Sequence, residues 1–176
     1  MVSDNEFSHF VKLNDIGAGE SNVHLSADLD ARTGLARRFD LASLDLLEAD
    51  IALSRSAKGV LAVGRFRADL VQSCVATGEP VSAHLDEPIT IRFMPEPITA
   101  ADAEIELDAD ECDTMFYDGL GVDLGEAVAQ TLGLSLDPYP RSPDAQARLK
   151  AAGVKSEEEI RPEGALAGLK DLLTRK

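Results

Sequence analysis

Ala62-Val-Gly-Arg-Phe-Arg-Ala-Asp-Leu70 alternates between two kinds of residue. The even-numbered positions are apolar or small, and the positions between them include two arginines and an aspartate. Alternation with a period of two is typical of a half-buried β-strand. The same pattern occurs before this stretch, from Leu47 to Leu53, and after it, from Val81 to Phe93. Short connections join the three stretches, so the sequence predicts an antiparallel β-meander with a long hairpin.

Two connections are expected to form the turns of this meander. Ser56 to Gly59 makes the first turn, and Cys74-Val-Ala-Thr77-Gly78-Glu-Pro80 makes the second, which is the tip of the hairpin. Pro88 interrupts the third alternating stretch. A proline inside a strand pattern indicates an edge position or a bulge, because proline has no N–H group to donate to a neighbouring strand.

Shorter elements flank the meander. A helix is predicted from Leu29 to Phe39, with Asp28 or Asp30 as its N-cap. A second helix is predicted after Asp123, because Glu126 completes an Asp-x-x-Glu variant of the capping box. Gly133 and then Asp137-Pro138-Tyr139-Pro140 are expected to close it. Its apolar face is formed by Leu124, Val128 and Leu132. Brief β-like runs occur at Phe10–Leu13, Val23–Leu25, Ile105–Leu107 and Met115–Tyr117.

The character of the chain changes after Pro140. Ser142-Pro143-Asp144 predicts the start of a short helix that continues to about Ala152, with proline at its first position. The tail from Pro162 to Lys176 carries leucines at helical spacing but is too short to form a stable isolated helix. We therefore expect a single α+β domain over residues 1–140 and a helical C-terminal extension over residues 141–176. The fold class is α+β, with two or three packed helices and a short C-terminal helical tail.

Composition favours a cytoplasmic protein with reduced thiols. The chain has 176 residues, of which 44% are hydrophobic, and contains no tryptophan. No apolar run approaches the ~20 residues that a transmembrane helix needs, and the first ten residues lack the basic start and apolar block of a secretory signal. Two cysteines do not make a disulfide framework, and a bridge between Cys74 and Cys112 is not favoured.

The negative charge is concentrated in the middle of the chain. The formal net charge is -15, and the segment from Phe93 to Pro140 contains twelve acidic residues and no Lys or Arg. Affinity for nucleic acid depends on Lys and Arg, so a broad RNA or DNA surface is disfavoured there. A basic protein partner suits this segment better, since complementary charge steers association. Simple solubility is the alternative that the charge leaves open.

Few residues stand at spacings known from metal sites. Thr77 occupies the position where a Cys-x-x-Cys pair would place a second thiolate after Cys74, and Cys112, His84 and Asp86 are too scattered to complete a zinc site. A partly buried, inert cysteine is the favoured interpretation. The acidic cluster Asp108, Asp110, Glu111 and Asp113 does not fit the calcium loop of an EF-hand, because its fifth and sixth positions are Cys112 and Asp113. No metal or cofactor is expected.

No catalytic constellation is apparent either. His9, His24 and His84 have no Ser, Cys or carboxylate at motif spacing, although a triad can assemble from distant residues. Arg65 and Arg67 share a strand face and, with the Arg37-Arg38 pair, are candidates for phosphate contact. Asp69 on the same strand face favours cross-strand ion pairing for these arginines.

The order of these features resembles the YceD-like family of large ribosomal RNA subunit accumulation proteins. In that family a Cys-x-x-Cys-x-x-Pro tip is followed by an acidic stretch, an Ile-Asp-Leu helix entry, a Leu-Ala-Leu-Pro-x-x-Pro end and a leucine-containing tail. The matching tip residues are Cys74, Gly78 and Pro80, the matching helix entry contains Asp123 and Leu124, and the matching end contains Pro138 and Pro140. The tail corresponds to Pro162–Lys170. The resemblance covers most of the chain beyond about residue 40.

The chain departs from the family at its presumed zinc ligands. Thr77 replaces one cysteine, and Arg141-Ser142-Pro143 stands where many members carry a second cysteine pair. The tip is therefore expected to be a degenerate zinc motif that binds no metal.

The resemblance implies a non-enzymatic ribosome-biogenesis factor that supports accumulation of large-subunit (23S) rRNA. We expect it to bind a basic ribosomal protein or a pre-50S assembly factor, with little or no direct RNA contact, no membrane association and an undetermined oligomeric state. The expected binding residues are Glu104, Glu106, Asp108, Asp110, Glu111 and Asp113. One alternative is a metal-dependent hydrolase or nuclease that acts on rRNA through the cluster from Asp108 to Asp113. Another is an RNA-binding module that uses Arg37, Arg65 and Arg67.

Overall fold

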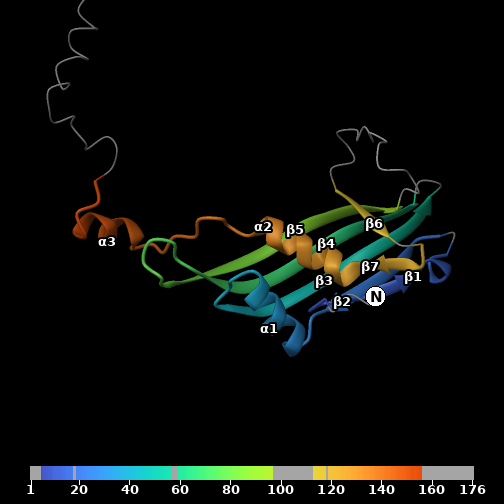
Figure 1. Cartoon of the computed structure of the whole chain (residues 1–176), viewed down its shortest axis with the longest axis horizontal. Helices are drawn as coiled ribbons and strands as arrows, with labels where there is room; N and C mark the ends of the chain where they lie inside the picture. Colours follow the sequence, from blue (N-terminus) through green and yellow to red (C-terminus); the bar gives the residue numbers. More distant parts are fainter. Residues whose placement is uncertain (1–4, 18, 57–58, 97–112, 118, 156–176) are drawn as a thin grey trace, which may run out of the picture.

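The computed structural model describes residues 5–17, 19–56, 59–96, 113–117 and 119–155 (Figure 1). Its main sheet has five strands in the order β2-β3-β4-β5-β6, and a second sheet pairs β1 with β7. The elements in chain order are β1 (Phe10–Lys12), the 3-10 turn η1 (Leu13–Asp15), β2 (Ser21–Ser26), α1 (Leu29–Arg38), β3 (Ser43–Ser56), β4 (Gly59–Ser73), β5 (Pro80–Pro95), β6 (Thr114–Tyr117), β7 (Gly121–Asp123), α2 (Leu124–Ser135) and α3 (Ala145–Ala151). The mostly antiparallel sheet and its helices form an α+β fold, as the sequence predicts.

Strands β3, β4 and β5 form the predicted antiparallel meander. Each is longer than its alternating stretch, with 14, 15 and 16 residues respectively. The pairing of β3 with β4 starts beside the first turn, where Ser56 pairs with Gly59, and shifts once, between Leu44 and Leu46. The pairing of β4 with β5 continues without a shift to Ser73 and Pro80. The hairpin is therefore long and regular, and the connection Cys74–Glu79 lies at its tip.

Pro88 lies in β5 without disturbing the pairing with β4, where it is the partner of Arg65. The backbone N–H of Arg92 points away from β4, since it donates to the carbonyl oxygen of Asp113 at 2.9 Å. Because backbone direction alternates along a strand, residue 88 also points its nitrogen away from β4. The missing N–H group thus costs no hydrogen bond within the hairpin. Within the described residues β6 covers only Arg92–Pro95, so Pro88 occupies an edge position, which confirms one of the two predicted options.

One hydrophobic core lies between the main sheet and helices α1 and α2. The sheet contributes the apolar faces of the three long strands, with Leu47 and Phe66 completely buried. Leu35 of α1 and Leu132 of α2 are also completely buried and belong to the same cluster. Each burial of such a side chain contributes about 1.5–3 kcal/mol. The predicted apolar face of α2 is confirmed, and the opposite face of the sheet is polar.

Strand β7 pairs with β1 in a small antiparallel sheet that the sequence did not reveal, with Val122 opposite Val11. A three-residue strand is too short to show a clear alternation. Asp123, the last residue of β7, caps α2 by accepting a hydrogen bond from the backbone N–H of Glu126 at 3.2 Å. The predicted helix start is therefore confirmed.

Three details of the helix predictions are wrong. Helix α2 continues through Gly133 to Ser135. Gly133 does not stop the helix but leaves room for the Phe39 ring, since a Cβ atom at this position would lie 2.8 Å from Cε1 of that ring. The carboxylate of Glu126 does not return to its cap residue, since it pairs with Arg38 instead. Helix α3 begins at Ala145, so Pro143 precedes the helix rather than opening it.

The β4–β5 tip and the segment leading to α3 lie at the same end of the molecule (Figure 1). Within the described part of the chain, no helix is long and apolar enough to cross a membrane. The predicted strand Ile105–Leu107 and the tail Pro162–Lys176 lie outside the described residues, and the division at residue 140 stays a prediction.

Candidate functional site

The tip of the hairpin is bound to the chain that follows α2. Val75 donates its backbone N–H to the carbonyl oxygen of Pro140 at 2.9 Å, and the backbone N–H of Ser142 donates to Sγ of Cys74 at 3.3 Å. Gly78 adopts a φ of 71°, a left-handed conformation that favours glycine, and donates to the carbonyl oxygen of Cys74 at 2.8 Å. The contacts of Val75 with Pro140 and of Cys74 with Ser142 join parts of the chain that are more than 60 residues apart in sequence.

Glu79 is the polar centre of this junction. Its Oε2 atom accepts hydrogen bonds from the hydroxyl groups of Thr77 at 3.3 Å and Ser142 at 3.1 Å. Its Oε1 atom forms an ion pair with Arg148 of α3. Ser142 is only 8% exposed, so its hydroxyl group depends on these protein partners rather than on bulk water. We call Cys74, Thr77, Glu79, Ser142 and Arg148 the tip network.

The network also changes the chemistry of Cys74. The Thr77 hydroxyl group, whose single proton serves either Cys74 or Glu79, and the backbone N–H of Ser142 lower the pKa of the Cys74 thiol to about 6, because hydrogen bonds from them stabilise the thiolate. The residue is a free cysteine and only 3% exposed. The predicted burial is confirmed and is more complete than expected, whereas the predicted inertness of the thiol stays a prediction.

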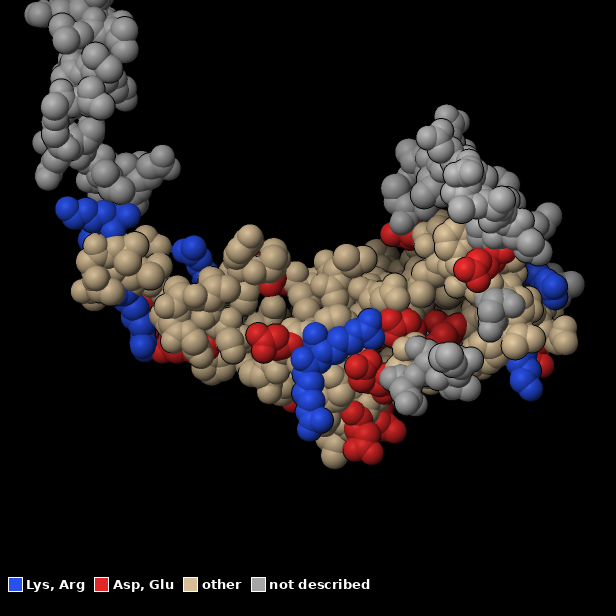
Figure 2. All heavy atoms as spheres, in the orientation of Figure 1, with Lys and Arg blue, Asp and Glu red and all other residues tan. Residues whose placement is uncertain are grey.

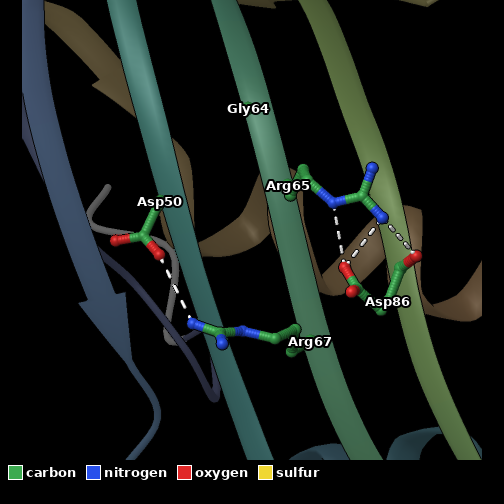
Figure 3. Close-up of a pocket in the computed structure, with 5 residues that line it drawn as sticks. All are labelled: Asp50, Gly64, Arg65, Arg67 and Asp86. Carbon is green, nitrogen blue, oxygen red and sulfur yellow. Dashed lines mark hydrogen bonds and ion pairs between the residues drawn. The ribbon is translucent and has the colours of Figure 1, made fainter.

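A second candidate site is the open face of the sheet, where charged side chains from β3, β4 and β5 surround a shallow cavity of about 380 Å³ (Figure 3). Arg65 pairs with Asp86 at 2.8 Å and also donates to the carbonyl oxygen of that residue. Arg67 pairs with Glu48 at 2.9 Å and with Asp50 at 3.6 Å. The two arginines are therefore engaged by neighbouring carboxylates, as the sequence predicts, although the partners differ from Asp69.

Asp69 pairs instead with His84 at 2.6 Å, and His24 pairs with Asp50 at 2.7 Å. These hydrogen-bonded pairs extend the row of polar side chains across neighbouring strands. Each side chain is about half exposed or more, so each pair contributes little to stability. The open face is thus a solvated surface on which opposite charges alternate. Carboxylates oppose the charges of Arg65 and Arg67, which makes these two arginines less available to an RNA backbone.

The expected partner-binding residues are only partly described. Asp113 is exposed and lies at the start of β6, where its carbonyl oxygen accepts the bond from Arg92. Glu104, Glu106, Asp108, Asp110 and Glu111 lie outside the described residues. The grouping of these six residues at one partner-binding site stays a prediction.

The residues of the family motif lie at two joints of the fold. Cys74, Gly78, Pro80 and Pro140 lie at the tip, and Pro138 lies in the segment between α2 and the tip. Asp123 and Leu124 form the start of α2, where Leu124 is completely buried. The carboxylate of Asp123 also accepts hydrogen bonds from the Ser8 hydroxyl group at 2.7 Å and from the backbone N–H of His9 at 2.9 Å, which fixes the N-terminal segment.

Sequence reasoning missed the roles of Glu79, Ser142 and Arg148. Glu79 belongs to the quoted tip, but nothing in its local sequence indicates partners 63 and 69 residues further along the chain. One signal was available in the sequence. Thr77 and Ser142 both stand where the family that the chain resembles carries presumed zinc-binding cysteines. Two positions of one site must lie close together in space, so that comparison predicts their contact.

The fold and its site define a class: an α+β protein in which a long hairpin is fastened at its tip to the chain beyond the second helix. The family model for the large ribosomal RNA subunit accumulation protein YceD matches residues 62–173, which is more than half of the chain. The chain belongs to the YceD family, and this membership implies a role in accumulation of large-subunit ribosomal RNA. No curated protein and no solved structure matches the chain significantly.

Proposed function

We propose that this protein is a non-enzymatic ribosome-biogenesis factor whose acidic segment binds a basic ribosomal protein or assembly factor. The observation that carries the proposal is the composition of residues 97–112, which include six acidic residues and no Lys or Arg. Hydrogen bonds fix both flanks of this segment at one end of the sheet: Arg92 donates to Asp113 at 2.9 Å, and Glu96 donates its N–H to the carbonyl oxygen of Tyr117 at 3.0 Å.

Charge elsewhere supports a basic protein rather than RNA as the partner of this segment. The arginines of the open face are paired with carboxylates, so they do not offset the negative charge of the segment. On the face shown in Figure 2, acidic side chains gather mainly over the middle of the molecule, where basic side chains lie among them, and basic side chains also occur at both ends. A segment with acidic and no basic residues accelerates association with a basic surface and repels phosphate.

The alternative of a metal-dependent hydrolase or nuclease has no comparable support. Asp108 and Asp110 lie outside the described residues, and the exposed Asp113 is the one member of that set which the structure describes. The cytoplasmic location and the identity of the partner are likewise part of the proposal.

Complementation and capture test the proposal together. The tagged full-length chain should recover ribosomal proteins or precursor particles from lysate at low salt and lose them at high salt, because surface electrostatic attraction is screened. A variant with Glu104, Glu106, Asp108, Asp110 and Glu111 replaced by Gln or Asn should lose this capture and fail to restore the ratio of large- to small-subunit rRNA in a strain lacking the gene.

A matched control variant removes the same number of negative charges at positions outside the acidic segment. Five exposed acidic residues away from the segment are replaced in the same way: Asp15, Glu20, Asp30, Asp45 and Glu87. This control variant should retain both capture and complementation. Equal loss of capture and complementation in the two variants would mean that net charge, and not the acidic segment, determines binding, which contradicts the proposal. Retention of both activities by the first variant would also refute it.

A further inference from the structure

The tip network has the spacing of a metal site but lacks the ligands. Two pairs of positions are separated by three residues, Cys74 with Thr77 and Ser142 with Ala145, and one pair comes from the hairpin and the other from the chain before α3. Structural zinc sites commonly combine two such pairs from different segments. Ala145 is 1% exposed and donates its backbone N–H to the carbonyl oxygen of Ser142, so this second pair forms a compact turn.

The side-chain separations fit this comparison. A tetrahedral zinc ion with bonds of about 2.3 Å to sulfur holds neighbouring ligand atoms about 3.8 Å apart. Here the hydroxyl oxygens of Thr77 and Ser142 lie 3.4 Å apart, and Sγ of Cys74 accepts hydrogen bonds from the Thr77 side chain and, at 3.3 Å, from the Ser142 backbone. The side chains of Thr77 and Ser142 therefore lie at nearly the distance that a shared metal ion would impose, and Cys74 lies beside both residues.

The donor set does not suit zinc. Structural zinc sites use four ligands drawn from cysteine, histidine and carboxylate side chains. The four positions here supply one thiol, two hydroxyl groups and one methyl group, and Glu79 adds one carboxylate. Within the described residues no group of three or more His, Cys, Asp or Glu side chains is arranged to hold a metal ion.

We propose that the tip has the arrangement of a zinc knuckle, a turn whose two segments are normally joined by a zinc ion, but is held together without metal. The Glu79 carboxylate takes the place of the ion. The carboxylate accepts hydrogen bonds from Thr77 and Ser142 and pairs with Arg148, so it connects the hairpin, the segment after α2 and helix α3. A metal ion joins its ligands in the same way, from the centre. The inference concerns closure of the tip and is independent of the proposed partner of the acidic segment.

Loss of the central carboxylate provides the first test. Glu79→Ala should accelerate hydrogen exchange of the Val75 and Ser142 amides at least tenfold, because both amides donate across the junction. Glu79→Gln should have a smaller effect, since its amide oxygen still accepts a hydrogen bond. The matched control is Glu87→Ala, which removes an exposed carboxylate further along β5 and should leave these amides unchanged. Unchanged exchange in Glu79→Ala would overturn the role of this residue.

Metal content provides the second test. The native chain, expressed with added zinc, should contain far less than one zinc ion per molecule, and a chelator should leave exchange at the tip unchanged. About one tightly bound zinc ion per native molecule would overturn the proposal. The triple variant Thr77→Cys, Ser142→Cys and Ala145→Cys should bind one zinc ion and then protect the tip amides even when Glu79→Ala is added. A folded triple variant without stoichiometric zinc would refute the knuckle geometry.

Discussion

Replacement of Asp123 with alanine should destabilise the protein more than the loss of an ordinary helix cap. Its Oδ1 atom accepts from the backbone N–H groups of both Glu126 and His9, and its Oδ2 atom accepts from the Ser8 hydroxyl group. One carboxylate therefore caps α2 and also holds the N-terminal segment beside the β1–β7 sheet. The substitution removes both functions at once.

The size of the effect follows from these contacts. Loss of an N-cap costs about 0.5–2 kcal/mol. Hydrogen bonds to a charged acceptor contribute about 1.5–3 kcal/mol each, but Ser8 and His9 are exposed, so water compensates for much of their loss. We expect Asp123→Ala to lower the free energy of unfolding by about 2–4 kcal/mol. For a chain of this size that corresponds to a decrease of about 4–16 °C in Tm.

Asp28→Ala provides the matched control. Asp28 caps α1 through a single hydrogen bond from the Ala31 N–H group at 2.9 Å, and the structure gives its side chain no second segment to hold. Its replacement should cost only about 0.5–2 kcal/mol. Thermal unfolding followed by circular dichroism compares the two variants, and hydrogen exchange reports on His9. Equal losses in the two variants, or unchanged exchange of the His9 amide in Asp123→Ala, would refute this account of the cap.

Three further predictions concern stability and ionisation. Gly133→Ala should lower Tm, although alanine has a better helix propensity than glycine by about 1 kcal/mol. The added methyl group must displace the Phe39 ring, which costs about 1–3 kcal/mol, and a higher Tm would contradict this contact. Pairing with Arg38 lowers the pKa of Glu126 in the folded protein below its ordinary value of 4.5. The pair therefore contributes fully to stability at pH values above 4.5, and this contribution is lost as the pH falls through the lowered pKa of the folded state. Urea unfolding across the acid range should therefore show a weaker pH dependence for Glu126→Gln than for the native chain. The Cys74 thiolate, followed by ultraviolet absorbance in a Cys112→Ser background, should titrate near pH 6, and stability should rise between pH 6 and 9; titration near 9 would contradict the hydrogen bonds.

The meander could be predicted because its strands carry their own signal. Leu47–Leu53 and Ala62–Leu70 alternate with the strand period, and burial of one sheet face preserves that pattern in the sequence. The helix starts were also recognisable, since Asp28 and Asp123 cap through backbone groups only three residues away. Local physical causes of this kind leave local patterns.

Features that depend on distant segments could not be predicted in the same way. The end of α2 was misplaced because Gly133 reads as a stop signal, whereas the Phe39 ring that occupies the space beside it comes from a residue 94 positions earlier. The parallel pairing of β6 with β5 likewise depends on where the chain returns after a long connection. Glu79 shows the same limit, because its partners Ser142 and Arg148 lie 63 and 69 residues further along the chain and leave no local pattern at the tip.

The two ends of β5 separate the tip network from the described residues that flank the acidic segment. Pro80 begins the strand at the tip, and Pro95 ends it beside β6. A strand of 16 residues is about 50 Å long at about 3.3 Å per residue, which is several times the Debye length of about 8 Å at physiological salt. Charge changes at Glu79 are therefore screened from the end of β5 that precedes the acidic segment. Glu79→Ala should open the tip and still allow capture of a basic partner, so a simultaneous loss of both would require mechanical coupling along the hairpin.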